Sequence, residues 1–436
     1  MAGLTSAPAS GLKGPVKVEI PSGLPERADE TGEVEVSFVL PCLNEAETIE
    51  RCIAAAIKCI RANNLSGEVV VADNGSTDGS QEMSRAAGAR VVAVAKKGYG
   101  NALMGGIEAA RGRFIIMGDS DASYDFAEGM KFVQKMRPEG GGYELVMGNR
   151  FDVRGGGGVQ RGAMPLKNRY LGNPVLSWVG RILFDCPVRD FHCGLRAFTK
   201  DAYRRMNVRT TGMEFASEIA IKATLQEMKI TEVPIKLWPD GRSRPPHLKP
   251  WRDGWRHLRF MVCLSPRWTL FVPGVVLLAF GLLAAAVVGL EQLNIGGVAF
   301  DVHTLVAASL ATIIGYQWCV AAVLMRVFGL HREIGPPSAS LHRWTSAFNL
   351  ERGLIAGVAL CVAGLVPMLW VLMHWWRAGF GPLDVQVTLR PMLIGATVMA
   401  VGVQTVLASL VFGMLRMRRE ATAPSSGAAL SERSSA

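Results

Sequence analysis

The sequence lacks paired cysteines. Its eight cysteines stand singly, and no Cys-x-x-Cys pair or other spacing typical of zinc ligands occurs. His192 and Cys193 are neighbours, but such a lone pair is more often structural than metal-binding. We therefore exclude a zinc module and predict reduced thiols in contact with the cytosol.

Charged residues are also scarce. They make up 19% of the 436 residues against 49% hydrophobic ones, which favours a membrane protein with at least two structural units. The shortage is uneven, because apolar and polar runs alternate up to Met261 whereas long apolar stretches dominate from Trp268. The formal net charge of +10 fits anionic partners, namely lipid head groups, nucleotide diphosphates or nucleic acid.

The first residues lack an apolar run long enough for a signal peptide. Residues 1–33 are instead rich in Ala, Gly, Ser and Pro, and we predict a disordered tail there. A second disordered tail is predicted for residues 417–436, at the other end of the chain.

Residues 34–240 alternate short apolar runs with helix-forming stretches. This alternation predicts an α/β domain with a mostly parallel sheet, and it places a ligand crevice at the carboxyl ends of the strands. The predicted strands are Val36–Leu40, Val69–Ala72, Arg90–Ala95 and Phe114–Met117, and the predicted helices run from Asn44 to Ile60 and from Ala102 to Ala110.

Residues 268–416 contain four apolar segments of about twenty residues or more, each long enough to cross a bilayer. Basic residues cluster before the first segment, between the second and third, and after the fourth, whereas residues 291–301 contain no Lys or Arg. Because basic residues stay in the cytoplasm, we predict a cytoplasmic-membrane protein whose termini and N-terminal domain are cytoplasmic. The segments are Thr269–Leu290, Leu305–Val327, Leu354–Trp376 and Met392–Leu415.

Two carboxylates follow the fourth predicted strand, in the run Asp119-Ser120-Asp121. Carboxylates one residue apart can hold a hard divalent cation, Mg²⁺ or Mn²⁺, which bridges diphosphate oxygens and stabilises a leaving nucleotide. Such a triplet in isolation is more often a solvated turn. Its position at the end of a buried strand favours the metal site.

Three earlier loops belong to the same edge of the predicted sheet. The first strand is followed by Pro41 to Glu45, which includes Asn44, and the second by Asp73 to Ser80. An Asp at a strand end can accept hydrogen bonds from a base or ribose, although Ser76, Thr77 or Asp78 can equally cap a helix. After the third strand, Lys97 and Gly98 offer a cation and backbone donors to a phosphate.

Six motifs in a fixed order carry a family resemblance: PCLNE, DNGSTDGS, KKGYGNAL, GDSDASYDF, GNRF and DFHCGLRAF. Over about Val34 to Phe260 the chain resembles the family-2 glycosyltransferases, and most of all the dolichyl- or polyprenyl-phosphate sugar synthases. The resemblance implies a Rossmann-like GT-A fold for the catalytic domain and a nucleotide-sugar donor.

The resemblance also implies roles for residues at matching positions. Pro41, Glu45 and Asp73 would bind the nucleotide, Asp119 and Asp121 the metal, and Asn44, Lys97, Gly98 and Ser120 lie in the same motifs. Two positions depart from the family pattern. Asn74 stands where a second Asp is common, and Ser123 replaces a frequent Gln, which leaves any third metal ligand open.

A polyprenyl phosphate acceptor is already anionic near neutral pH, so it needs cations that position it more than it needs a base. The candidates are Arg150, Arg169 and Arg196, which we group with Asp121 as catalytic residues. The resemblance points to Arg150 and, less closely, to Arg169 with a polar residue four positions later. A packing salt bridge competes for each arginine, and Asp190 is a candidate to orient Arg196.

Residues 241–267 form a basic run interleaved with Trp251 and Trp255. Basic residues and tryptophans before an apolar segment predict an interfacial helix. By likeness to the family, the start of the run predicts a loop that closes over the donor diphosphate through Arg242, Arg244 or Lys249.

The sequence thus predicts a metal-dependent membrane glycosyltransferase that moves a hexose from UDP-glucose or GDP-mannose to polyprenyl phosphate, and the family resemblance implies that the transfer inverts the anomeric carbon. Another lipid acceptor, or a lipid transporter with a regulatory domain, are the alternatives. A processive polysaccharide synthase is disfavoured, because Leu264 and Ser340 stand where its Gln-x-x-Arg-Trp motif requires Gln. No nucleic-acid module is evident, so nucleic acid is not a predicted partner.

Overall fold

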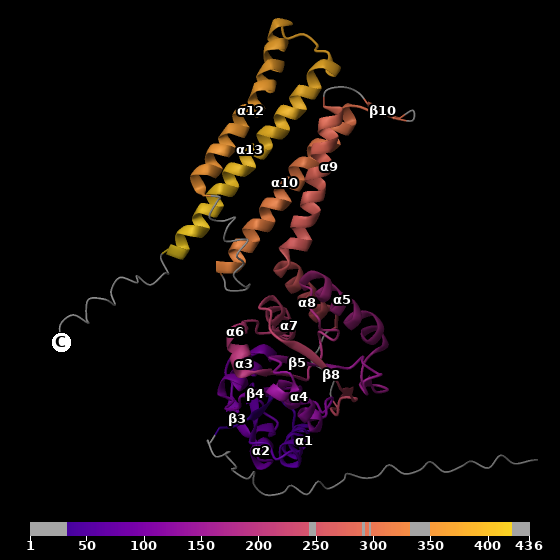
Figure 1. Cartoon of the computed structure of the whole chain (residues 1–436), viewed down its shortest axis with the longest axis vertical. Helices are drawn as coiled ribbons and strands as arrows, with labels where there is room; N and C mark the ends of the chain where they lie inside the picture. The colour runs from indigo at the N-terminus through magenta and orange to yellow at the C-terminus, as the bar shows by residue number, and fades with distance from the viewer. Residues whose placement is uncertain (1–32, 244–249, 290–292, 296–297, 332–348, 421–436) are drawn as a thin grey trace, which may run out of the picture. The chain divides into compact units, whose positions relative to one another are not determined.

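The computed structural model describes residues 33–243, 250–289, 293–295, 298–331 and 349–420 (Figure 1). Contacts divide the chain into two compact units that interleave along the sequence. The catalytic unit comprises Met1–Pro174, Val188–Ala216 and Met228–Pro250, and the helical unit comprises Val175–Pro187, Ser217–Glu227 and Trp251–Ala436. The predicted tails lie outside the described residues, except for Glu33 and residues 417–420.

The catalytic unit is built on a seven-stranded sheet of order β3-β2-β1-β4-β7-β5-β8. The first four strands pair in parallel, as predicted, whereas β7 runs antiparallel to both β4 and β5. The sheet is therefore mixed. Its strands are β1 (Val36–Cys42), β2 (Gly67–Asp73), β3 (Arg90–Ala93), β4 (Phe114–Met117), β5 (Leu145–Asn149), β7 (Arg196–Thr199) and β8 (Ile230–Pro234).

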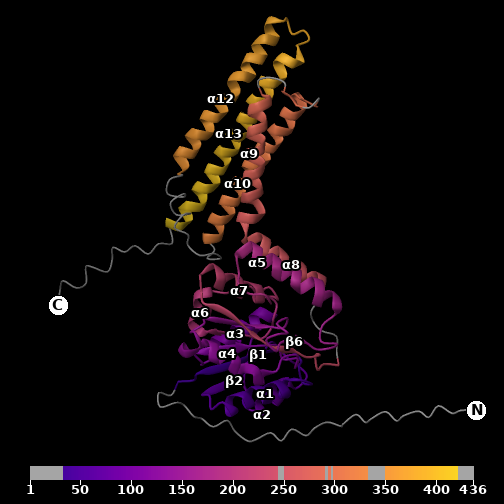
Figure 2. The same ribbon diagram turned by 45° about the vertical axis from the view of Figure 1, so that its right-hand side comes forward.

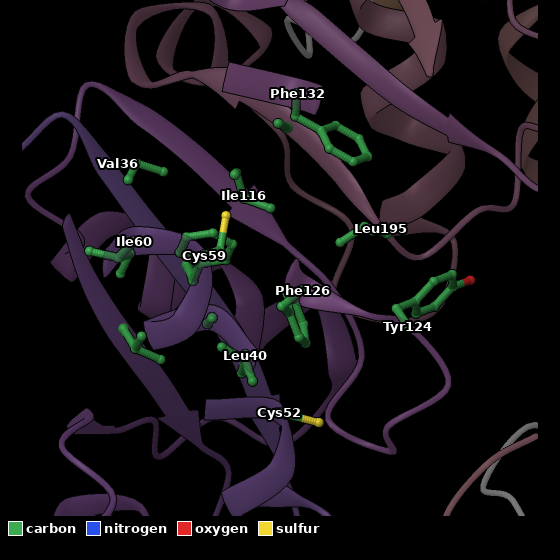
Figure 3. Close-up of a cluster of buried hydrophobic side chains, with 14 of the residues drawn as sticks. Val36, Leu40, Cys52, Cys59, Ile60, Ile116, Tyr124, Phe126, Phe132 and Leu195 are labelled. Atoms are coloured by element: carbon green, nitrogen blue, oxygen red, sulfur yellow. The ribbon is translucent and has the colours of Figure 1, made fainter. Parts of the chain in front are cut away.

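Helices cover both faces of this sheet because β1 is apolar on both sides. Phe38 and Leu40 belong to a core cluster with α1 (Ile49–Ala62) and α4 (Gly129–Met136), which Figure 3 shows around Phe126 and Phe132. On the other face, α3 (Tyr99–Ala109) brings Gly106 so close that an added Cβ would lie 2.7 Å from Val39 Cγ1. Such close packing on two faces fixes the strand ends.

Shorter elements complete the catalytic unit and border its loops. The helices are α2 (Ser80–Ala86), η1 (Phe126–Glu128), η2 (Pro138–Gly140), η3 (Asn168–Gly172) and α6 (Lys200–Met206), and a small separate sheet pairs β6 (Gly158–Val159) with β9 (Lys236–Leu237).

Three shorter helices of the helical unit precede its long ones: α5 (Asn173–Phe184), α7 (Phe215–Leu225) and α8 (Pro250–Leu264). Helices α5 and α8 lie side by side in Figure 2, where Ser265 Oγ donates to the Leu183 carbonyl at 3.2 Å. In α8, Asp253, His257 and Met261 are buried at a spacing of four residues, whereas Trp251 is 91% exposed. The predicted helix is therefore present and amphipathic, and its location at a membrane surface stays a prediction.

Four helices of the described chain are long and apolar enough to cross a membrane: Arg267–Val288, Val302–Leu330, Leu350–Arg377 and Val387–Leu415. They confirm the four predicted apolar segments and extend most of them. They belong to η4 (Arg267–Phe271) with α9 (Val272–Val288), α10 (Val302–His331), α12 (Leu350–Arg377) and α13 (Val385–Glu420), and a hairpin of β10 (Leu293–Ile295) and β11 (Val298–Phe300) follows α9. The tail predicted from residue 417 is wrong for residues 417–420, because α13 continues through them.

Glycines bring the long helices together. A Cβ on Gly364 of α12 would lie 2.6 Å from the Gly395 carbonyl oxygen of α13, and one on Gly402 would lie 2.8 Å from the Gly357 carbonyl. A Cβ on Gly274 of α9 would lie 3.0 Å from the Gly315 carbonyl of α10. Backbones approach this closely only where side chains are absent, which is the usual way in which helices associate in lipid.

An ion pair links α13 to the residue that precedes α10. Arg390 Nη2 donates to Asp301 Oδ1 at 2.6 Å, which joins α13 to the start of α10. The predicted segment began at Met392 and so left this arginine out. The observed span starts at Val387, and the paired carboxylate offsets the charge that it includes.

Candidate active site

The carboxylates predicted to bind a metal lie at the carboxyl end of β4. Tyr99 Oη donates to Asp119 Oδ1 at 2.9 Å, and the Ser123 amide donates to Asp121 Oδ1 at 3.0 Å. Burial and the neighbouring Asp121 carboxylate raise the pKa of Asp119 to about 6. Ala122, directly after Asp121, has φ 60, a left-handed conformation that L residues rarely adopt. Backbone strain of this kind is typical of functional sites.

Gly194 makes room for Asp119. This glycine lies in the DFHCGLRAF motif, and an added Cβ would be only 2.4 Å from Asp119 Oδ2. Its amide donates to Tyr124 Oη at 2.8 Å, which fixes the backbone beneath the carboxylate. The motif that leads into β7 therefore brings its backbone against the Asp119 carboxylate.

Arg242 gathers three carboxylates around one guanidinium. Its Nη2 lies 2.8 Å from Asp121 Oδ2 and 3.1 Å from Asp240 Oδ2, and its Nη1 lies 3.0 Å from Glu45 Oε1. Burial lowers the pKa of Arg242, but the Asp121 carboxylate and its neighbours outweigh this and raise it overall. The predicted loop arginine therefore meets the predicted metal and nucleotide residues, although they are far apart in sequence.

The donor set fits a divalent cation that is shared with a substrate. In the part of the chain that the structure describes, no three His, Cys, Asp or Glu side chains are arranged to hold a metal ion by themselves. Mg²⁺ is commonly bound by one or two carboxylates together with substrate phosphates and water. Asp119 and Asp121 provide such an incomplete set, and the guanidinium on Asp121 shows that this place attracts positive charge.

Side chains from neighbouring loops hold the first strand end. Ser120 Oγ donates to the Pro41 carbonyl at 2.6 Å, and Thr48 Oγ1 donates to the Ser120 carbonyl at 2.7 Å. Asn44 has φ 58, and its Oδ1 accepts the Thr77 amide at 2.8 Å. Ser120 and Asn44, both predicted to bind the donor, thus join the loops that follow β1, β2 and β4.

Asp73 and Asn74 organise the loop after β2. The Asp73 carboxylate is buried and accepts the amides of Gly75 and Ser76 and the Gln81 side chain. Asn74 Nδ2 donates to the Val94 and Lys96 carbonyls, and its Oδ1 accepts the Gly98 amide at 2.8 Å. Asn74, the departure from the family pattern, therefore links the second loop to the third.

The third loop holds Lys97 and Gly98. Lys97 Nζ donates to the Asn74 carbonyl at 2.5 Å, so its charge lies over the loop after β2. Gly98 has φ +131, and a Cβ there would be 2.5 Å from the Thr211 carbonyl oxygen, so only glycine fits. Lys97 and Gly98, both predicted to bind the nucleotide-sugar donor, thus lie beside Asp73 and Asn74.

Arg150 is held by Asp190. Its Nε and Nη2 each donate to the carboxylate at 2.7 Å, and its backbone amide adds a third bond at 3.0 Å. Asp190 was predicted to orient Arg196, and this prediction is wrong. The planar guanidinium of Arg150 takes both carboxylate oxygens instead. Arg150 Nη1 has no hydrogen-bond partner among the described residues.

The other two predicted arginines have different environments. Arg196 has 0% exposure and donates to the Cys193 carbonyl and, at 2.6 Å, to the Ala216 carbonyl. These contacts with backbone carbonyls hold its positive charge inside the protein near Asp119. Arg169 lies in η3, where its guanidinium faces the ring of Tyr170 at 5.4 Å. No contact in the described chain joins it to the carboxylate cluster.

Sequence reasoning missed Tyr99, Asp240 and Gly194 as parts of the site. Tyr99 stands inside a motif that was identified, but its contact with Asp119 depends on how α3 packs. Of the three, Asp240 could most easily have been predicted from the sequence. It lies two residues before Arg242, and its carboxylate holds the Arg242 guanidinium.

Comparisons with known proteins identify the family of this chain. The model of the glycosyl transferase family 2 domain matches residues 37–205, and that of the glycosyltransferase family 2 C-terminal transmembrane region matches residues 323–416. The low-salt glycan biosynthesis hexosyltransferase Agl6 of Haloferax volcanii is 33% identical over 87% of this chain and 89% of its own. Glycosyltransferase AglJ of the same organism is 32% identical over 50% of this chain and 68% of its own.

Among solved structures, glucosyl-3-phosphoglycerate synthase from Mycobacterium tuberculosis, in complex with Mn²⁺, UDP and glucosyl-3-phosphoglycerate, matches with a TM-score of 0.40. It is 22% identical over 53% of this chain and 78% of that chain. The family resemblance and the predicted enzyme class are thus confirmed by the sequence matches. The chain belongs to glycosyltransferase family 2 and is a membrane glycosyltransferase with a Rossmann-like α/β catalytic domain and four C-terminal apolar helices.

Proposed function

We propose that the protein transfers a hexose from a nucleotide diphosphate sugar, UDP-glucose or GDP-mannose, to polyprenyl phosphate. The observation that carries this proposal is that one chain combines a carboxylate pair at the end of β4 with four apolar helices. The carboxylates suit a water-soluble diphosphate donor, and the helices suit an acceptor that resides in the bilayer. The hexosyltransferase name of the relative Agl6 supports the choice of sugar.

On the donor side, Asp119 and Asp121 would hold Mg²⁺ or Mn²⁺. The metal ion would neutralise the diphosphate and stabilise the nucleoside diphosphate as it leaves. Arg242, now on Asp121, brings a second positive charge to the same place, and we expect it to turn to the diphosphate when the donor binds. Tyr99 and Gly194 keep Asp119 in position throughout.

On the acceptor side, a phosphate oxygen of the polyprenyl phosphate would attack the anomeric carbon of the donor sugar. The bond between that carbon and the donor diphosphate would break at the same time. Direct displacement of this kind inverts the anomeric configuration, and it needs no general base because the phosphate is already ionised. Arg150 is our choice for positioning the acceptor. Asp190 fixes two of its nitrogens, and Nη1 remains to bind a phosphate oxygen.

We further propose that the catalytic unit and both termini are cytoplasmic. Support comes from the distribution of basic residues, which are absent from residues 291–301 and frequent at the opposite ends of the spans. Nucleotide sugars are cytoplasmic metabolites, so this orientation also gives the carboxylates access to the donor.

The test is a transfer assay with purified protein in detergent. Undecaprenyl phosphate is incubated with Mn²⁺ or Mg²⁺ and a panel of radiolabelled nucleotide sugars, and the label in the organic phase is counted. We expect label from one donor, and we expect it to vanish with a chelator. Asp121→Asn should lower the rate at least about 100-fold, while the exposed Asp201→Asn should leave it unchanged.

The outcomes separate the parts of the proposal. Transfer to diacylglycerol but not to the polyprenyl phosphate would reject the acceptor and keep the enzyme class. Full activity of Asp121→Asn, or full activity in chelator, would reject the metal site at Asp119 and Asp121.

A further inference from the structure

Gln317 lies on the surface of α10, in the middle of an apolar span. The candidate span runs from Val302 to Leu330, so about 20 Å of helix separate this residue from either end. Its side chain is exposed, and its amide has no hydrogen-bond partner in the part of the chain that the structure describes. A glutamine side chain is too short to reach the membrane surface from this depth.

The other polar side chains inside the spans are placed differently. Thr312 Oγ1 donates to the Ala308 carbonyl of its own helix at 2.8 Å. Tyr316 and Thr405 share a hydrogen bond of 2.6 Å between α10 and α13. Away from the span ends, Gln317 is the one exposed side chain with an amide, hydroxyl or charged group among the described residues. Hydrocarbon offers such a group no hydrogen bond, so its amide requires a protein partner.

Gln317 belongs to a stripe of residues that repeats every 3.5 positions along α10. One side of this helix packs against α9 and α13, as both ribbon views show, whereas most of the stripe is exposed. A repeat of this period is typical of two parallel helices that pack side by side, and a small residue in it lets their backbones approach. The stripe consists of Leu310, Ile314, Gln317, Ala321, Leu324 and Phe328.

A second copy of the same chain would satisfy this amide. Copies of one chain have the same orientation in the membrane, so two α10 helices that meet along the stripe run parallel and place each residue opposite its own copy. A glutamine side chain both donates and accepts, so two copies of Gln317 can bond to each other. Hydrogen bonds between polar side chains are one of the means by which helices associate in lipid.

We propose that two copies of the chain associate in the membrane through the exposed stripe of α10, with a hydrogen bond between their Gln317 side chains at its centre. This bond fixes the register of the two helices, because a shift along the helix axis leaves both amides in hydrocarbon. The proposal goes beyond glycosyl transfer. It rests on the membrane location of the helices and does not depend on the donor, the acceptor or a metal ion.

Association is measured by energy transfer between full-length chains that carry different fluorescent proteins fused at Met1. The two are reconstituted together into phosphatidylcholine vesicles at decreasing ratios of protein to lipid. The ratio at half-maximal energy transfer gives the strength of association. An excess of chain without a fluorescent protein should abolish the transfer, which separates specific association from crowding.

Two substitutions at the centre of the stripe test the amide. Gln317→Leu removes it, and Gln317→Asn keeps it on a shorter side chain. Because one hydrogen bond between helices is lost, Gln317→Leu should need about tenfold more protein per lipid for the same energy transfer. Gln317→Asn should lie between Gln317→Leu and the unmodified protein. Each variant has to elute as a single species in gel filtration before its association is measured.

A matched pair of substitutions tests the face of the helix. Ile314 and Val323 are both 40% exposed on α10, but only Ile314 lies on the stripe. Ile314→Trp should weaken association, because the bulky side chain holds the two helices apart. Val323→Trp adds similar bulk to another side of the helix and should leave association unchanged.

A disulfide bond tests which residues face each other. The described cysteines that are not buried, Cys263, Cys319 and Cys361, are first replaced by alanine. In this background, Gln317→Cys should give covalently paired chains when the membranes are oxidised, because a disulfide requires two close side chains. Val323→Cys in the same background should not.

The proposal is overturned if the unmodified protein shows no energy transfer that unlabelled chain can abolish, or if Gln317→Leu associates as strongly as the unmodified protein. Covalent pairs that form as readily from Val323→Cys as from Gln317→Cys would also overturn it, because another face of α10 would then lie at the contact. No sugar, acceptor or metal enters these experiments, so their failure would leave the transfer assay and its conclusion untouched.

Discussion

The two units differ in what they bring into close contact. In the catalytic unit, charged groups are packed closely at the strand ends: Asp190 holds Arg150, Gly194 lies against Asp119, and three carboxylates share Arg242. In the helical unit, the long helices are joined backbone to backbone at glycines such as Gly364. The first unit should therefore be sensitive to the removal of a charge, and the second to the addition of an atom.

The largest effect is expected from removing the carboxylate of Asp190. Its side chain has 0% exposure, and Asp190→Ala would leave the Arg150 guanidinium buried without its anion. Breaking a buried ion pair in this way destabilises a protein by about 3–5 kcal/mol. Thermal unfolding should show the loss. Asp201→Ala breaks an exposed pair with Arg204 and should change the melting temperature little, so equal effects of the two variants would contradict the comparison.

Gly194→Ala tests the packing beneath Asp119. The new methyl group would lie 2.4 Å from Asp119 Oδ2 and 2.8 Å from Tyr124, so the carboxylate has to move. We expect transfer activity to fall about 100-fold, as for other displaced catalytic groups. Gly158→Ala, where an added Cβ meets no atom within 4 Å, is the control. Normal activity of Gly194→Ala would show that the position of Asp119 is not critical.

Gly364→Ala tests the helical unit. The added Cβ would lie 2.6 Å from the Gly395 carbonyl oxygen, so α12 and α13 have to separate. Overpacking of this kind costs about 1–3 kcal/mol, which should lower the apparent melting temperature in detergent. Gly329→Ala adds the same methyl group to an open position of α10 and should leave it unchanged. A similar loss in both variants would mean that helix approach is not the cause.

The smallest effect is expected from breaking the ion pair between Arg390 and Asp301 in the helical unit. The side chains of Arg390 and Asp301 are 16% and 32% exposed, so neither charge is fully buried in the protein. Arg390→Gln should therefore lower the apparent melting temperature only slightly. A loss as large as that of Asp190→Ala, measured by the same thermal unfolding, would erase the difference between the two units.

Much of the fold was predictable because its strongest signals are local. Continuous apolar runs gave the buried strands β1 and β4, and long uncharged runs gave the four spans. The antiparallel direction of β7 was not predictable, because Arg196–Thr199 is a short run whose partners lie far away in the sequence. Side chains alternate between the two faces of a sheet in parallel and antiparallel strands alike, so this alternation does not reveal in which direction a strand runs.

The residues of the candidate site were easier to predict than the contacts that they make with one another. The motifs identified Asp121 and Arg150, and the basic run identified Arg242; each lies in a loop at a strand end. Which partner each one takes depends on long-range packing. Arg242 reaches a carboxylate 121 positions away, and Asp190 takes Arg150 rather than the arginine six residues after it.

Asn74 has a consequence for building chimaeras of this family. Its side chain bonds to the Val94 and Lys96 carbonyls and to the Gly98 amide, while Asn44 and Ser120 join the remaining loops. A loop grafted alone from a relative would arrive without the partners that hold it and would leave its neighbours with broken hydrogen bonds. The loops at the carboxyl edge of the sheet therefore depend on one another, and in a chimaera they have to be exchanged together.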